Sequence, residues 1–140
     1  MALKLAAPLI ETVKLEDIDP TGETFAVFVQ ATMEQHERRN AIFADREYSW
    51  ADSEVGVIRQ RSKWNPDEQA RLEVFLTLRD CNITDDKDNL LFPFKNGKIG
   101  ESQFYQAWAK MPPEWASSLH KACYQVNKVW AGRPKADEEA

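Results

Sequence analysis

The chain has 140 residues, of which 43% are hydrophobic and 29% charged, and its net charge is −5. These values suit one soluble domain with a modest core and exclude global disorder. The acidic balance disfavours general binding to nucleic acid, and no apolar run approaches the roughly 20 residues of a membrane span. Because Pro8 breaks the short apolar patch at the start, we expect no signal peptide and a cytoplasmic protein.

The first regular elements are two strands, predicted over residues 9–17 and 24–30, which are rich in β-branched and aromatic residues. Pro20 fixes its own φ and Gly22 tolerates a positive φ, so the segment between the two strands is predicted to be a turn. The two strands then form a hairpin. Both faces of the second strand are apolar, which predicts a strand that is covered on both faces or central in its sheet.

Thr32 and Gln35 form a capping-box pattern that starts a helix over about residues 33–48. A loop is expected over residues 49–54, and alternation predicts a further strand over 54–64. The basic side chains near that strand can guard a sheet edge or contact phosphate, and the acidic net charge favours the first. They are Arg59, Arg61 and Lys63, with Arg38, Arg39 and Arg46 on the preceding helix.

The clearest helix signal begins at Asn65, a good N-cap that is followed by Pro66. Apolar residues then cover most of the circumference, which predicts a buried central helix that ends near Cys81 and Asn82. A long loop over residues 82–100 follows, with a polar, acidic tip and a short apolar insert, Leu90-Leu91-Phe92, that Pro93 ends.

The segment 104–130 predicts a helical hairpin. Its first apolar stripe has i, i+3, i+4, i+7 spacing and ends at Pro112-Pro113, where a second helix begins. The apolar side of the second helix is expected to extend from Trp115 to Trp130. Such stripes form a core or a docking face for a partner.

Together these elements predict an α+β fold. It is a helix-dominated domain over residues 1–130, with an N-terminal β-hairpin in a small antiparallel sheet and a C-terminal helical hairpin. The strand-containing part spans 8–64 and the helical part 65–130, and residues 131–140 are expected to form a flexible acidic tail.

No motif predicts a catalytic, metal or cofactor site. The acidic run Thr84–Asn89 fails the EF-hand pattern in either frame, and the two histidines do not cluster. Cys81 and Cys123 are expected to be reduced and buried. An enzyme is a third alternative, because His120 and Cys123 lie three residues apart on one predicted helix.

The run from Arg71 to Trp130 resembles the tail assembly chaperones of long-tailed bacteriophages. The earlier segment VFVQATMEQHERRNAIFA looks like the strand-then-helix opening of such proteins, so the resemblance covers about residues 24–130. The family pattern is a leucine-rich helix, a loop, and then aromatic, Pro-Pro and V-N-x-x-W positions. In this chain those positions are Phe104, Trp108, Met111, Pro112, Pro113, Ala116, Leu119, Ala122, Val126, Asn127 and Trp130. Met111 replaces the usual Leu of the pattern, and Lys128 stands where a Pro is common.

The resemblance implies a non-enzymatic factor in the host cell cytoplasm that binds the apolar, helical tape-measure protein and helps recruit tail-tube subunits. Self-association is a further expectation. The alternative is a structural virion component, such as a head–tail or tail-tube adaptor, whose N-terminal hairpin extends a neighbour's sheet. The expected partner-binding residues are Trp108, Met111, Trp115, Leu119 and Trp130.

Overall fold

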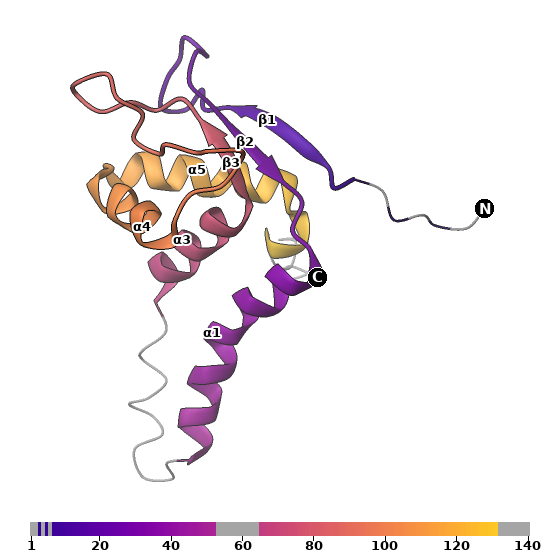
Figure 1. Cartoon of the computed structure of the whole chain (residues 1–140). Helices are drawn as coiled ribbons and strands as arrows, with labels where there is room; N and C mark the ends of the chain where they lie inside the picture. The colour runs from indigo at the N-terminus through magenta and orange to yellow at the C-terminus, as the bar shows by residue number, and fades with distance from the viewer. Residues whose placement is uncertain (1–2, 4, 6, 53–64, 132–140) are drawn as a thin grey trace, which may run out of the picture.

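The computed structural model describes residues 3, 5, 7–52 and 65–131. Strands β1 (Ile10–Lys14), β2 (Phe25–Val29) and β3 (Leu78–Cys81) form one antiparallel sheet in the order β1-β2-β3 (Figure 1). The helices are α1 (Met33–Asp52), α3 (Pro66–Thr77), α4 (Glu101–Lys110) and α5 (Pro113–Val126), with a 3₁₀ helix η1 (Lys128–Ala131). The predicted α+β fold is confirmed.

The predicted hairpin is β1–β2, and its turn has the expected conformation. Gly22 has φ 75°, a backbone conformation that is strained for any residue with a side chain. The carboxylate of Asp19 closes the turn by accepting hydrogen bonds from the backbone and hydroxyl groups of Thr21 and Thr24. Strand β2 is the central strand, as its two apolar faces predicted.

Helix α1 begins as predicted and ends later. The amide of Thr32 donates to Gln35 Oε1 at 3.0 Å, and the amide of Gln35 donates to Thr32 Oγ1 at 3.3 Å, so the capping box is formed. The loop predicted from residue 49 is wrong as far as residue 52, which is still helical. Residues 49–52 contain no Gly or Pro to interrupt the helical hydrogen bonds.

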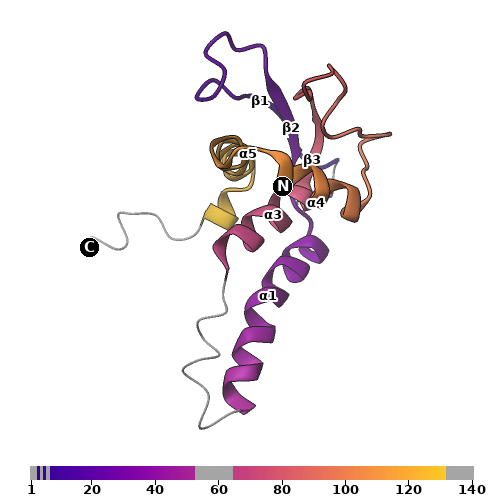
Figure 2. The same ribbon diagram turned by 90° about the vertical axis from the view of Figure 1, so that its left-hand side faces the viewer.

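Figure 2 shows α1 leading away from the sheet and the other helices. The strand predicted over 54–64, with the basic residues Arg59, Arg61 and Lys63, lies outside the described residues.

The central helix is correctly placed at its start and wrongly extended at its end. Asn65 caps α3 by accepting from the amides of Asp67 and Glu68, as predicted. The helix stops at Thr77, and the next four residues form β3 instead of a last helical turn. Leu78–Cys81 include the charged residues Arg79 and Asp80, and it is the pairing with β2 that makes them a strand.

The core lies where α5 packs against β1, β2 and α3. One cluster of buried apolar side chains extends from Leu15 to Trp130 and includes Phe28, Phe92 and Phe104, each fully buried. None of the helices in the described ranges is both long and apolar enough to cross a membrane.

Candidate partner-binding site

The Pro-Pro pair separates two helices, as predicted. Met111 is the C-cap of α4, Pro112 is the N-cap of α5, and Pro113 is its first residue. Both helices pack against α3. On α4, the ring of Phe104 lies 5.3 Å from that of Phe75 on α3.

The five predicted partner-binding residues separate into two groups. Leu119, Trp130 and Met111 are 0%, 3% and 8% exposed, so their side chains belong to the core. Trp108 and Trp115 are partly exposed. Trp130 was expected on the second helix but lies in η1, because α5 ends at Val126. The main candidates for surface contact are therefore Trp108 and Trp115, and the small exposed part of Met111 also lines a surface groove.

Trp108 lines a groove between the start of α3 and the α4–α5 turn, here named the helix groove. Its volume is about 450 Å³, which lies in the range of ligand sites. Residues from three helices line it: Pro66, Asp67, Ala70, Trp108, Ala109, Met111, Pro113, Ala116, Ser117 and His120. Small alanines beside a tryptophan and a methionine make a surface that is suited to another apolar element.

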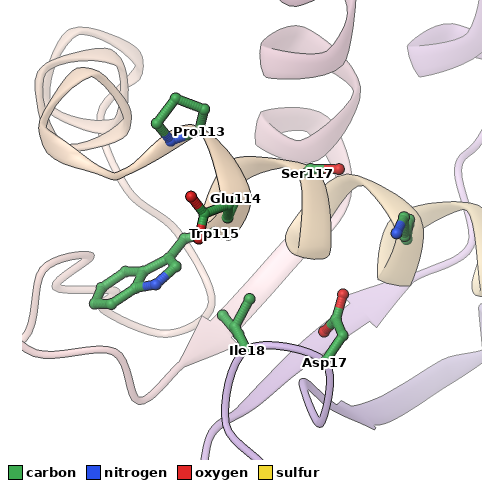
Figure 3. A pocket seen from close by; sticks show the side chains of 7 residues that line it. Asp17, Ile18, Pro113, Glu114, Trp115 and Ser117 are labelled. Atoms are coloured by element: carbon green, nitrogen blue, oxygen red, sulfur yellow. The ribbon is translucent and has the colours of Figure 1, made fainter.

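Trp115 lines a different hollow, here named the turn pocket, beside the first turns of α5 (Figure 3). Its volume is about 520 Å³, and it lies between α5 and the β1–β2 turn, which contributes Asp17 and Ile18. Ser118 Oγ donates to Asp17 Oδ1 at 2.5 Å and fixes the turn against the helix.

The structure therefore brings Trp108 and Met111 together in one hollow and places Trp115 in the other. Pro113 and Ser117 line both hollows, so the start of α5 stands between them as a ridge. Sequence reasoning missed Asp17, Ile18 and Ala70. They enter these hollows only through contacts between distant segments, and no local pattern marks them.

Behind the helix groove lies a buried carboxylate that ties three helices together. Glu73 on α3 is fully buried, and its Oε1 lies 2.6 Å from His120 Nε2 on α5. Arg39 Nε on α1 donates to Glu73 Oε2 at 2.7 Å, and Tyr124 on α5 donates its hydroxyl to Oε1 at 2.8 Å. Because His120 also lines the groove, Glu73 fixes part of the groove wall.

The ionisation of Glu73 follows from these contacts. Burial opposes the charge, but the hydrogen bonds from His120, Arg39, Tyr124 and Gln69 outweigh it, so the pKa of Glu73 lies below its ordinary value. Burial and the carboxylate together raise the pKa of the Tyr124 hydroxyl. Glu73 is therefore a charged, fully hydrogen-bonded anchor at neutral pH.

The last residues of the fold attach the C-terminal segment to the junction of β2 and α1. Asn127 Oδ1 accepts from the amide of Ala31 at 2.7 Å, and its Nδ2 donates to the carbonyl of Val29 at 3.2 Å. Trp130 Nε1 donates to His36 Nδ1 at 2.9 Å. The V-N-x-x-W positions of the family pattern thus have a structural role in this chain.

The cysteines are free and buried, as predicted. Burial raises the pKa of Cys123 to about 12 and that of Cys81 to about 11, so both thiols are protonated at neutral pH. Cys123 Sγ lies 3.3 Å from Thr77 Oγ1, while His120 Nε2 is directed to Glu73. This geometry favours a packing role for Cys123 over the alternative of a catalytic thiol.

Within the described ranges, no three His, Cys, Asp or Glu residues are grouped so as to hold a metal ion. Comparison of the chain with models of protein families, curated proteins and solved structures gives no match.

Proposed function

We propose that the chain is an assembly chaperone of the phage-tail type, which holds an apolar helix of a tape-measure protein in the helix groove. The observation that carries the proposal is the position of the family-like segment. Phe104–Trp130 resembles such chaperones, and the same segment supplies Trp108, Met111 and Pro113 to the groove.

The composition of the groove fits an apolar helix as its occupant. A partner helix can place small or branched residues against Ala70, Ala109 and Ala116, while Trp108 supplies a large apolar surface. Exposed charges nearby, such as Lys110 and Asp67, keep the rim hydrated. The net charge of −5 helps to keep a complex with an apolar partner soluble.

The rigidity of the groove also supports the proposal. The groove wall contains His120, which Glu73 holds from behind, and Glu73 is in turn held by α1. A preformed groove loses less conformational entropy when a partner binds. The ridge formed by the start of α5 keeps this site apart from the turn pocket.

Co-purification with a candidate tape-measure protein, a long apolar helical protein of the same phage, tests the proposal. We expect Trp108→Ala to lose most of the bound partner, and Trp115→Ala, a matched change in the turn pocket, to retain it. Both variants should keep a cooperative unfolding transition, because both rings are only partly buried. Equal retention by the two variants would exclude the helix groove as the site.

One observation favours the second candidate, a structural virion component: β1 lies at the edge of the sheet, where it can extend a neighbouring sheet. The protein composition of purified virions separates the two functions. A chaperone is absent from the finished tail, whereas a stoichiometric amount of this chain in virions would replace the chaperone proposal with the structural one.

A further inference from the structure

Among the residues that the structure describes, strand β1 has a hydrogen-bonding partner strand on one side only. The order β1-β2-β3 places it at the edge of the sheet, and among the described residues no strand lies beyond it (Figure 1). Its side chains are mostly exposed: Ile10 is 59% exposed, and Val13 is the one residue of the strand that is partly covered. Exposed edges of this kind are templates for pairing with a further strand.

The register shows which backbone groups of β1 are not hydrogen-bonded to β2. The amide of Gln30 donates to the carbonyl of Leu9, and the amide of Leu15 donates to the carbonyl of Thr24. Because hydrogen-bonded pairs alternate along an antiparallel ladder, the odd-numbered residues of β1 bond to β2. The amides and carbonyls of Ile10, Thr12 and Lys14 therefore point to the open edge.

We propose that this edge binds β1 of a second copy of the chain, antiparallel and centred on Thr12, so that two sheets join into one. Strand β1 runs from Ile10 to Lys14, and the chain bends after it at Leu15, whose carbonyl accepts from Asp19. Pro8, just before the strand, has no amide to donate. Full overlap of two such strands thus requires Thr12 to face Thr12.

The charges of β1 agree with this register. Ile10 lies opposite the second copy's Lys14, and Glu11 lies opposite the second copy's Val13, so no like charges face each other. Centring the pair on Glu11 or on Lys14 would instead place two equal charges opposite each other, which is unfavourable. The outward backbone groups of the even-numbered residues also face one another only in registers of this parity.

The proposed interface is small, so we expect the affinity between the two copies to be low. The three outward residues of each copy allow about six backbone hydrogen bonds, each worth about 0.5–1.5 kcal/mol net. Apart from Ile10 and Leu9, which is 48% exposed, the seam buries little apolar surface. We therefore expect a reversible, concentration-dependent dimer and not an obligate one.

Cysteine cross-linking tests the register directly. In the proposed dimer the two Thr12 Cα atoms lie about 5.5 Å apart, within reach of a disulfide, whereas the two Lys14 residues are four positions out of register. Under diamide oxidation, Thr12→Cys should give a covalent dimer and Lys14→Cys, on the same face and also exposed, should not. The native thiols do not interfere, because Cys81 and Cys123 are buried.

Sedimentation velocity over a range of protein concentrations tests the association without cross-linking. Thr12→Pro removes an outward amide that the β1–β2 ladder does not use, so we expect a folded monomer, while Thr12→Val should dimerise like the wild type. A wild-type chain that stays monomeric at every concentration would overturn the proposal. Equal cross-linking of Thr12→Cys and Lys14→Cys would overturn it as well.

Discussion

The two sides of α5 differ in the burial and hydrogen bonding of their side chains. On the inner side, Leu119 and Cys123 pack into the core, and His120 and Tyr124 are hydrogen-bonded to the buried carboxylate of Glu73. The outer side carries exposed Pro113 and Ser117 between two hollows. One helix thus contributes both to the core and to the surface. The element that packs against each residue decides its role more than the amino-acid type does.

The largest expected effect is on the inner side. Glu73→Ala removes the acceptor shared by Arg39, His120 and Tyr124, so we expect it to lower the free energy of unfolding by about 3–5 kcal/mol. Urea denaturation measures this loss. Glu68→Ala, at an exposed position in the first turn of the same helix, is the control and should cost at most about 1 kcal/mol. Similar losses in both variants would show that Glu73 does not anchor the inner side.

A smaller effect distinguishes the buried Trp130 from the partly exposed Trp108 and Trp115. Trp130→Phe keeps an aromatic ring but removes the indole N–H that donates to His36, so we expect a loss of about 1–3 kcal/mol. Partner co-purification should not change, because Trp130 is buried. The neighbouring Val129→Ala, at an 80% exposed position, serves as the control and should be neutral in thermal unfolding. Reduced partner binding by a stable Trp130→Phe variant would contradict this division of roles.

The smallest effect concerns the turn that borders the turn pocket. Hydrogen bonds from Thr21 and Thr24 lower the pKa of Asp19 from 3.8 to about 2. A carboxyl whose pKa is lower in the folded state stabilises the fold above its unfolded pKa, and this contribution disappears as the pH falls from about 4 to about 2.

Thermal unfolding midpoints measured across this acidic range test the turn. Asp19→Asn should unfold at a lower temperature than the wild type at neutral pH, and the two midpoints should converge toward pH 2. Asp17→Asn, in the same turn but hydrogen-bonded to Ser118, is the comparison variant. A constant gap between wild type and Asp19→Asn at all pH values would show that the carboxylate charge of Asp19 is not responsible.

Local signals predicted the ends of several elements well. The Asn65 cap, the Thr32–Gln35 capping box and the Pro112-Pro113 stop each depend on residues within one turn, so sequence alone contains them. The helix-to-strand change after Thr77 does not depend on neighbours in sequence. It depends on β2, which lies about 50 positions earlier in the chain.

The candidate site was predicted only in part for the same reason. The apolar stripes identified the segment that contains Trp108 and Met111, but spacing along a helix cannot tell which side a second helix will cover. Glu73 shows the limit most clearly. It stands in an apolar run as an apparent surface charge, and its four partners come from three helices. Only the packing of those helices shows that it is buried.

Asn127 has a consequence for the order in which the protein folds. Its amide group satisfies the backbone of Val29 and Ala31, which lie nearly a hundred positions earlier, as a neighbouring strand would. During synthesis from the N-terminus, β2 and the start of α1 are therefore complete long before their last partner exists. Contacts between positions far apart in the chain slow folding. The junction of β2 and α1 should therefore reach its final structure only after the end of α5 has been synthesised. Truncation of the chain before Asn127 would thus affect the hairpin that was made first.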